Sequence, residues 1–308
     1  MNTSKTHCVD VVLSVAAKDN LIVRTVIKQI YKHINVSKIY ILTKPEFTIF
    51  YADLKKKYNV IVLDEDLAIP NISFAKLDKV IKNRSGKPLR TGWYFQQFLK
   101  MGFAMSKYAE EYYLIWDADT MPVSNLSFFD GLNPLFAEDL MEEGLHTPYF
   151  NTLSKLIPGL TYEKYSFIVE SMIVKTEIMK HLINDISNSK SRGDFWYEKI
   201  INAIDPGDDI AFSEFETYGT FANNRYPNYY KIRKIRKWRT AGEKYGRVLL
   251  QKDLNELELE NEWDTVSFEP LNKPKFFRYS YQFVIKVILY TVNYLLEKVY
   301  FIKSKKTL

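Results

Sequence analysis

The chain has 308 residues, a net charge of +6 and a hydrophobic content of 46%, which is enough for one large domain with a sizeable core. Its single cysteine, Cys8, excludes a disulfide within the chain and favours a reducing compartment. The opening segment MNTSKTHCVDVVLSV lacks a charged leader followed by a long apolar run, so we expect no secretory signal.

The first part of the chain alternates between strand and helix patterns. Apolar, β-branched runs predict strands at 9–16, 37–43 and 59–66, and helical spacing of apolar residues predicts helices at 21–34 and 47–58. Such alternation is typical of a parallel sheet covered by helices. We therefore predict an α/β fold with a mostly parallel sheet flanked by helices.

The rest of the chain is less regular. A helix is predicted at 90–108, with Thr91 or Gly92 as its cap, and a strand at 112–116 follows it. Further patterns predict, in order, a strand at 166–174 and helices at 176–186, 195–204 and 213–224. No internal repeat or low-complexity linker is present, which favours one domain through residue 270.

Two strands end in a pair of aspartates, Asp64 with Asp66 and Asp117 with Asp119. Ligands of open α/β sheets bind at this end of the strands. Side chains two residues apart in an extended segment point the same way, and carboxylate oxygens suit Mg²⁺ or Mn²⁺. The small Ala118 and the break expected after it favour the second pair, while the first pair is expected to be a solvated strand end.

Five segments in order carry a family resemblance: TGWYFQQFLKM, LIWDADTMP, HTPYF, SFIVESMIV and SEFETYG. Over residues 9–225 they resemble a bacterial family of GT-A-type glycosyltransferases encoded with capsule and lipopolysaccharide genes. The resemblance implies a GT-A-like (Rossmann-like) catalytic domain at 1–270, with nucleotide-sugar binding in 1–122 and acceptor binding and catalysis in 123–270. It also implies that an Asp-x-Asp motif binds the nucleotide-sugar through a divalent metal, Mn²⁺ or Mg²⁺.

The resemblance assigns the donor site residue by residue. Asp117 would face the ribose or a metal-bound water, and Asp119 would ligate the metal. His146 would bind acceptor, donor phosphate or metal, although a lone histidine is more often structural.

The end of the first strand, Ala17–Asp19, would hold the nucleotide base and ribose. There Lys18 would meet a phosphate and Asp19 a uracil N–H, with a helix cap at Asp19 as the plain alternative.

The candidate base lies in the segment SEFE. An inverting transfer needs a carboxylate to deprotonate the acceptor hydroxyl, whereas a retaining transfer needs none. Ser213 and Glu216 have the spacing of a capping box, which leaves Glu214 freer for chemistry. We predict an inverting transfer with Glu214 as the base and keep Glu216 and Asp209 as alternatives.

Other polar residues are candidates for the same cleft. The amide of Gln97 suits sugar hydroxyls, whereas Trp93 on the same helix is expected in the core. Arg84 and Arg90 flank the loop RSGKP, which we expect to be flexible and to close over donor phosphates. Solvated loop cations are the alternative.

Charge and amphipathicity point to a membrane surface. The block 231–252 carries nine basic residues and one acidic residue, which favours anionic partners. The tail 271–308 reads as an amphipathic helix interrupted by charges such as Lys286 and Glu297, so it is expected to lie in the membrane interface rather than to span the membrane. Packing on the domain or on a partner chain is the alternative.

Together these features predict a metal-dependent hexosyltransferase that uses a UDP-sugar and acts on a lipid-linked capsule or lipopolysaccharide glycan. We expect it in the cytoplasm, peripheral on the inner face of the cell membrane, with no nucleic-acid partner; the sequence leaves its oligomeric state open. One alternative is a non-catalytic glycan-binding or scaffold protein. The other is a nucleotidyltransferase, which the glycine-free segment VVLSVAAKDN disfavours.

Overall fold

The computed structural model describes residues 7–141, 144 and 146–269, together with seven positions between 284 and 296. The chain divides into two compact units that interleave along the sequence. Unit 1 comprises residues 1–12, 65–116 and 128–234, and unit 2 comprises residues 13–64, 117–127 and 235–308. Residues on both sides of position 122 therefore contribute to each unit.

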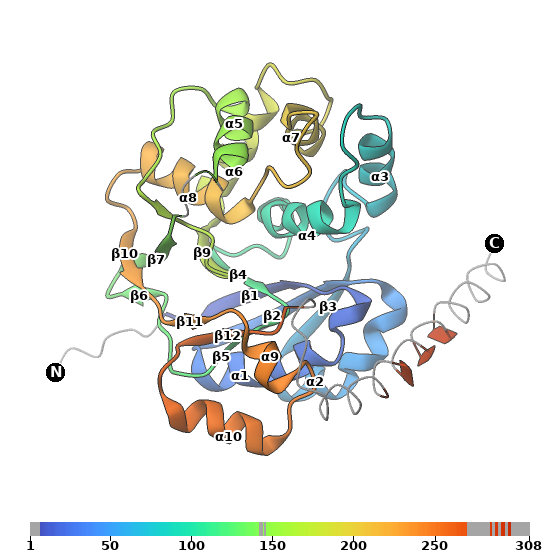
Figure 1. Cartoon of the computed structure of the whole chain (residues 1–308), viewed down its shortest axis with the longest axis vertical. Helices are drawn as coiled ribbons and strands as arrows, with labels where there is room; N and C mark the ends of the chain where they lie inside the picture. The colour runs from blue at the N-terminus through green and yellow to red at the C-terminus, as the bar shows by residue number, and fades with distance from the viewer. Residues whose placement is uncertain are drawn as a thin grey trace. The chain divides into compact units, whose positions relative to one another are not determined.

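Unit 2 contains the alternating strands and helices predicted from the sequence (Figure 1). The predicted strands at 37–43 and 59–66 are β2 and β3, which pair in parallel from Ile39 opposite Val60 to Thr43 opposite Asp64. In the same unit the end of β1 neighbours β2, which gives the order β3-β2-β1. Unit 2 contains the last two residues of β1, a strand that spans Val9–Ser14. The elements that follow in this unit, through β3, are η1 (Ala17–Asp19), α1 (Ile22–His33), β2 (Val36–Thr43), η2 (Pro45–Tyr51), α2 (Ala52–Lys57) and β3 (Val60–Asp64).

A small separate sheet completes unit 2. Its order is β11-β12-β5, with β5 (Thr120–Pro122) antiparallel to β12 (Thr265–Ser267) and β11 (Lys237–Trp238) parallel to β12. The sequence predicts that the strand breaks after Asp119. In the structure, the chain leaves the main sheet and continues directly as β5, a strand of this second sheet. Between β11 and β12 lie α9 (Ala241–Tyr245) and α10 (Gln251–Glu260).

Unit 1 contains the continuation of the main sheet, in the order β1-β4-β9. β4 (Tyr112–Asp117) and β9 (Ser171–Lys175) are antiparallel, with Trp116 opposite Ser171. The strand predicted at 166–174 is divided, because β8 (Tyr165–Ser166) ends before a break in which Glu170 adopts φ +58°. The main sheet is therefore mixed, and the predicted α/β class with parallel strands and flanking helices is confirmed.

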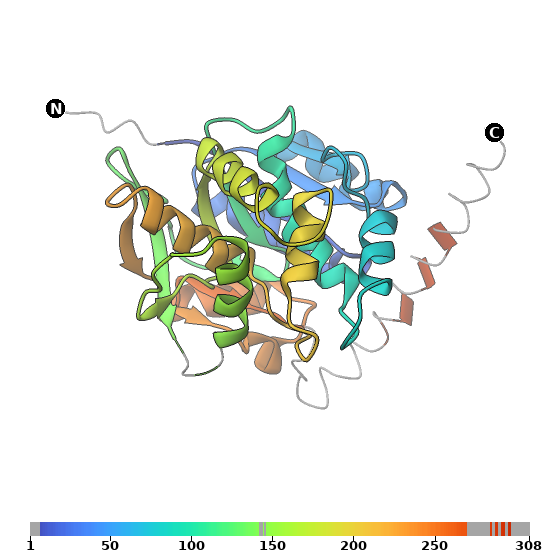
Figure 2. The ribbon, with the colours of Figure 1, turned by 90° about the horizontal axis from the view of Figure 1, so that it is seen from above.

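The helices of unit 1 pack against one another. α7 contacts α3, α5 and α6, and α8 contacts α4, α5 and α6, as Figures 1 and 2 show from two directions. The predicted helices at 90–108, 176–186, 195–204 and 213–224 are confirmed as α4, α6, α7 and α8. The remaining elements of unit 1 are α3 (Phe74–Lys82), α4 (Thr91–Gly102), η3 (Phe103–Met105), β6 (Phe129–Asp130), β7 (Asn133–Leu140), α5 (Thr147–Leu156), α6 (Thr176–Ser187), α7 (Trp196–Ala203), α8 (Glu214–Arg225) and β10 (Lys231–Lys234).

The start of α4 differs from the prediction. Its N-cap is Arg90, whose side chain makes no capping hydrogen bond, and Thr91 is the first helical residue. The Thr91 hydroxyl instead donates to Asp78 Oδ1 at 2.9 Å, which joins α4 to α3.

The tail prediction falls mostly outside the described residues. Of residues 271–308, the structure describes positions 284, 287, 288, 291, 292, 295 and 296, all helical. None of the helices in the described part of the chain combines the length and the apolar character that crossing a membrane requires.

Replacing Gly219 with alanine should test the packing of α8. A Cβ at this position would lie 2.2 Å from Phe167 Cγ, and Phe167 is fully buried between Phe136 and Tyr165. We expect Gly219→Ala to lower the free energy of unfolding by about 1–3 kcal/mol, the usual cost of overpacking a core, in urea unfolding followed by circular dichroism. Gly92→Ala, which has no atom within 4 Å of the new Cβ, is the control and should be at least as stable as the wild type. Wild-type stability of Gly219→Ala would contradict this packing.

Candidate functional site

The aspartate pair of unit 2 is held between two sheets. Asp117 is the last residue of β4, and Asp119 immediately precedes β5. The Phe268 amide donates to the Asp119 carbonyl oxygen at 2.8 Å, and the hydroxyls of Thr120 and Ser267 hydrogen bond at 2.8 Å. Both aspartate side chains are half-buried. The β5–β12 pairing thus fixes the backbone of the Asp-x-Asp segment.

The residues predicted at the end of the first strand gather around this pair. Burial and the neighbouring carboxylates of Asp117 and Asp19 raise the pKa of Asp119 to about 7, while Arg247 and Lys18 act to lower it. Asp19 belongs to η1, which follows β1. Unit 2 therefore brings together three carboxylates and two cations that the sequence separates by more than 200 residues.

Arg247 is the functional candidate that sequence reasoning did not single out. Its guanidinium forms an ion pair with Asp19 and donates to the carbonyl oxygens of Phe268 at 2.9 Å and Lys18 at 3.2 Å. Gly246 before it has φ +67° and ψ −166°, a conformation that a side chain disfavours. Nothing in the basic block distinguishes Arg247 from its eight neighbours except this preceding glycine.

In the other aspartate pair, Asp64 with Asp66, the second member contacts the start of a helix. Asp66 lies in unit 1, is exposed and accepts a hydrogen bond from the Phe74 amide at 2.6 Å, at the first residue of α3. A solvent-exposed carboxylate at a helix start satisfies an otherwise unpaired amide. Asp66 is thus solvated, as expected at this strand end, whereas Glu65 beside it is buried.

Glu214 is not the free carboxylate that the sequence predicts. Its Oε1 lies 2.7 Å from Lys100 Nζ, and the two side chains are 4% and 1% exposed. Its amide donates to Gln97 Oε1 at 3.1 Å, and Gln97 Nε2 donates to the Trp93 carbonyl oxygen. Glu214 and Gln97 are thus buried side chains that join α8 to α4.

Glu216 does not complete the predicted capping box. Ser213 Oγ does accept from the Glu216 amide at 3.3 Å, so the predicted cap of α8 is confirmed. The Glu216 carboxylate, however, accepts from Ser166 Oγ at 2.9 Å, the Phe167 amide at 3.0 Å and Thr220 Oγ1 at 3.3 Å. Burial raises the pKa of Glu216, and these donors act against the rise. Glu216 therefore anchors the break between β8 and β9.

His146 belongs to the same buried chain of hydrogen bonds. Its Nε2 lies 2.9 Å from Ser166 Oγ, which in turn donates to Glu216. The His146 ring is buried, and its Nδ1 has no hydrogen-bond partner among the described residues. Within the described part of the chain, no group of three or more His, Cys, Asp or Glu side chains is arranged to hold a metal. His146 as a third metal ligand thus finds no support in this arrangement.

The loop that carries Arg84 is fastened rather than free. Arg84 donates to the carbonyl oxygens of Ile204 at 3.0 Å and Asp205 at 2.6 Å. Lys87 Nζ lies 3.2 Å from Asp209 Oδ1, and this hydrogen bond lowers the pKa of Asp209. The loop that was expected to be flexible is therefore held to residues 204–209 by these hydrogen bonds and this ion pair. The Arg84 side chain makes two of the hydrogen bonds.

Arg90 differs from Arg84 in being exposed. Its guanidinium lies 5.6 Å from the ring centroid of Trp93, which is itself half-buried. Trp93 is thus only partly buried, and the phosphate contact of Arg90 stays a prediction.

Breaking the Lys100–Glu214 pair should destabilise unit 1 strongly. Lys100→Met would leave a buried, unpaired carboxylate, which typically costs about 3–5 kcal/mol. The double variant Lys100→Met/Glu214→Leu should regain most of this loss in urea unfolding, since it buries no charge. Lys87→Met removes an exposed pair and should leave the unfolding transition nearly unchanged. A double variant as unstable as Lys100→Met would show that the pair does more than neutralise one buried charge.

Comparisons with known proteins were made for the whole chain. No curated protein matches it. Among solved structures, it resembles the galactosyltransferase LgtC in complex with donor and acceptor sugar analogues, at 9% identity and TM-score 0.45, covering 85% of this chain and 88% of that one. It also resembles apo mouse xyloside xylosyltransferase 1, at 10% identity and TM-score 0.45, covering 86% and 99%. A third is the glycosyltransferase GlyE of Streptococcus pneumoniae TIGR4, at 13% identity and TM-score 0.43, covering 97% and 65%.

Identities and TM-scores this low carry no argument about function. The family comparison is of a different kind, because one family model matches residues 7–279, which is most of the chain. The chain therefore belongs to DUF6492, a family of unknown function.

Proposed function

We propose that this protein is a metal-dependent glycosyltransferase that transfers a hexose from a UDP-sugar to a lipid-linked glycan of the bacterial surface. The observation that carries the proposal is the gathering in unit 2 of Asp19, Asp117 and Asp119 with Lys18 and Arg247. A nucleotide diphosphate requires cations for its phosphates, and carboxylates can hold one of those cations as a metal ion. The choice of a UDP-sugar and a surface glycan rests on the family resemblance of the sequence motifs.

The carboxylate pair fits a divalent metal. Asp117 and Asp119 supply the hard oxygen ligands that Mg²⁺ and Mn²⁺ prefer. Burial and the like charges of Asp117 and Asp19 raise the pKa of Asp119, and a divalent cation would neutralise those charges. Two protein carboxylates leave coordination positions for water and the donor phosphates, and the small side chain of Ala118 leaves room for them. When bound, the metal would supply neutralisation of the charge that develops on a leaving diphosphate.

The cations and η1 would bind the rest of the donor. Lys18 is exposed beside Asp19, so its ammonium is available to a phosphate. Arg247 holds the Asp19 carboxylate in place, and Ala17–Asp19 would lie along the base and ribose. These roles extend the sequence-based assignment of the same residues and add Arg247 to it.

The catalytic base is assigned by accessibility. A base must reach the acceptor hydroxyl, and the carboxylates of Glu214 and Glu216 are buried and engaged. Among the three predicted candidates, Asp209 has the most exposed side chain, at 47%. An exposed carboxylate is ionised at neutral pH and can accept a proton, so we propose Asp209 as the base of an inverting transfer.

Asp119 should be required for donor binding and transfer. In the wild type, UDP with Mn²⁺ should raise the melting temperature, because a ligand that binds the native state stabilises it by about 2.7 kcal/mol at a hundred times its Kd. Asp119→Ala should lose this shift and also lose hexose transfer from UDP-sugars, while its circular dichroism spectrum stays that of a folded protein.

Asp66→Ala is the matched control for Asp119→Ala. It removes an aspartate from the other pair, where Asp66 accepts a hydrogen bond at the start of α3, and it should keep the full shift. An Asp119→Ala variant with wild-type shift and activity would overturn the metal assignment. A shift without transfer in the wild type would favour a glycan- or nucleotide-binding protein over an enzyme.

Membrane association is the second part of the proposal. At the described positions of the tail, five apolar side chains are exposed by 36–57%: Val284, Val287, Ile288, Val292 and Leu295. Their spacing places them along one face of a helix. Lysines at 303, 305 and 306 follow in the sequence, and the two features together suit the interface of an anionic membrane. We place the protein at the cytoplasmic face of the cell membrane, where lipid-linked acceptors would be within reach.

Removing residues 279–308 should release the protein from membranes. We expect the full chain to sediment with vesicles of phosphatidylglycerol and phosphatidylcholine, and the truncated chain to remain in the supernatant. Ile288→Asp should weaken sedimentation, because it places a charge on the apolar face. The control is Leu140→Asp, which changes an apolar side chain that is 86% exposed and lies outside the tail. This variant should sediment as the wild type does. Sedimentation of the truncated chain would place the anchor in another part of the protein.

A further inference from the structure

The segment 247–268 begins and ends at the carboxylate site of unit 2. At its start Arg247 forms the ion pair with Asp19, and at its end the Phe268 amide donates to the Asp119 carbonyl oxygen. Between these two points run α10 and β12.

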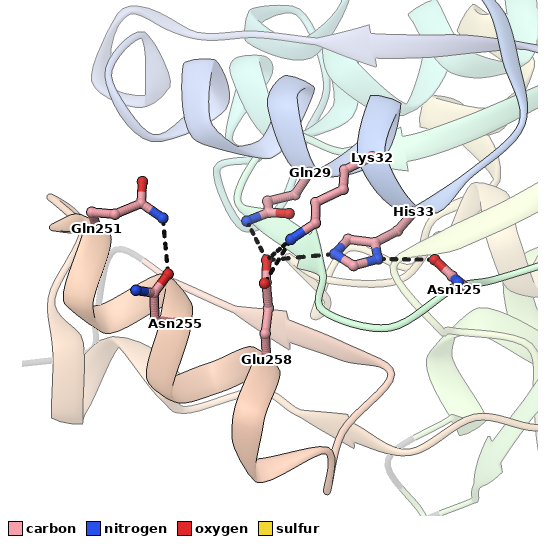
Figure 3. A network of polar contacts seen from close by, with 7 residues as sticks. All are labelled: Gln29, Lys32, His33, Asn125, Gln251, Asn255 and Glu258. Atoms are coloured by element: carbon pink, nitrogen blue, oxygen red, sulfur yellow. Dashed lines mark hydrogen bonds and ion pairs between the residues drawn. The ribbon is translucent and has the colours of Figure 1, made fainter.

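Among the carboxylates that hold α10, Glu256 and Glu260 pair with Lys244, whereas Glu258 reaches α1 (Figure 3). The Glu258 carboxylate accepts from Lys32 Nζ at 2.6 Å through both oxygens and from Gln29 Nε2 at 3.1 Å. Both donors lie on α1, so Glu258 joins α10 to the helix that follows η1. The Glu258 side chain is 25% exposed, which leaves the contact partly shielded from water.

His33 adds a titratable group to this contact. Its Nδ1 lies 3.2 Å from Asn125 Oδ1, an acceptor, so we assign the ring proton to Nδ1. Its Nε2 is buried, lies 3.7 Å from Glu258 Oε1 and has no hydrogen-bond partner among the described residues (Figure 3). The charged groups that face the ring are Glu258 from α10 and Lys32 from α1, and Asn125 contributes a neutral amide.

The two protonation states of His33 therefore meet Glu258 differently. The neutral ring presents the Nε2 lone pair to a carboxylate, which gives no bond. The protonated ring presents an N–H and a positive charge to the same carboxylate, beside the charge of Lys32. Burial acts to raise the pKa of Glu258, but the hydrogen bonds from Lys32 and Gln29, followed by the charges of Lys32 and His33, lower it overall. Acid thus adds a second cation to the α1–α10 contact.

We propose that Glu258 is a positioning residue for the carboxylate site of unit 2, and that the charge on His33 sets how firmly it holds α10 against α1. The proposal rests on the proposed function only in taking Asp119 as part of the donor site. Glu258 acts through the segment 247–268, whose ends contact Asp19 and Asp119. A tighter α1–α10 contact makes the Phe268–Asp119 hydrogen bond open less often.

The test follows single amide protons by NMR-detected hydrogen exchange in the full chain without ligands, corrected for intrinsic exchange rates. The reporter is the Phe268 amide, which donates a hydrogen bond to the Asp119 carbonyl oxygen and lies ten residues from Glu258 in the sequence. In Glu258→Gln we expect protection of this amide and of the α10 amides to fall together, by about two- to fivefold, the size of a partly exposed ion pair. Loss of protection in α10 alone would give Glu258 a merely local role and overturn the proposal.

The pH dependence separates the contribution of His33. From about pH 8 to about pH 6, the range in which histidines generally titrate, protection of the Phe268 amide should rise in the wild type. His33→Gln should remove this rise. Glu258→Gln should reverse it, because protonated His33 and Lys32 then face each other without an anion. Equal pH dependence in the wild type and His33→Gln would refute the role of His33.

Two further variants complete the design. Asn255→Ala removes a hydrogen bond within α10, between Gln251 Nε2 and Asn255 Oδ1 at 3.0 Å, and should leave the Phe268 amide unchanged (Figure 3). Lys32→Gln is the second route to a weakened contact should Glu258→Gln fail to fold, and it should lower protection of both α10 and Phe268. Since no ligand is present, these outcomes do not depend on whether UDP or Mn²⁺ binds, so failure here is distinguishable from failure of the proposed function.

Discussion

The crowding of negative charge around Asp119 is the constraint on which the rest of unit 2 depends. Burial of Asp119, and then repulsion from the carboxylates of Asp117 and Asp19, raise the pKa of Asp119. The folded chain tolerates this crowding because Arg247 returns to pair with Asp19. That return requires the chain after residue 235 to run back to the end of β4, and the pairing of β12 with β5 provides the path. The same strands that complete the small sheet therefore also stabilise the site.

In the motif SEFETYG of unit 1, by contrast, both buried carboxylates have partners. Glu214 is neutralised by Lys100, and Glu216 accepts three hydrogen bonds from Ser166, Phe167 and Thr220. In the same motif, the residue at position 219 must be glycine because a Phe167 ring fills the space of a Cβ. SEFETYG is thus explained at four positions by capping, pairing and packing. The two glutamates of this motif resemble catalytic residues, but both are buried and bound to structural partners.

The sequence predicts those features of the structure that depend on residues close to one another in the chain. Apolar spacing located α1, β2, β3, α4, α6, α7 and α8, and the Ser213 cap followed from residue type and position. Glu216 was assigned to the wrong partner, because a capping-box glutamate and one that reaches another loop have the same local sequence. The break before β9 was missed because the apolar pattern continues through it, while Glu170 takes a left-handed backbone. Arg247 depends on a contact with residue 19, which no local pattern encodes.

The basic block 231–252 shows how a linear charge pattern changes when the chain folds. At least six of its nine cations have acidic partners among the described residues: Lys231 with Asp130, Lys234 with Glu138, Arg236 with Asp264, Arg239 with Glu269, Lys244 with Glu256 and Glu260, and Arg247 with Asp19. Paired charges produce little field beyond a Debye length, so this block attracts an anionic surface far less than its sequence indicates. In the proposed function, attraction to a membrane would then come from the apolar positions and the lysines of the tail. The ion pairs of the block fasten the segments of each unit, and one of its members, Arg247, holds Asp19 of the carboxylate site.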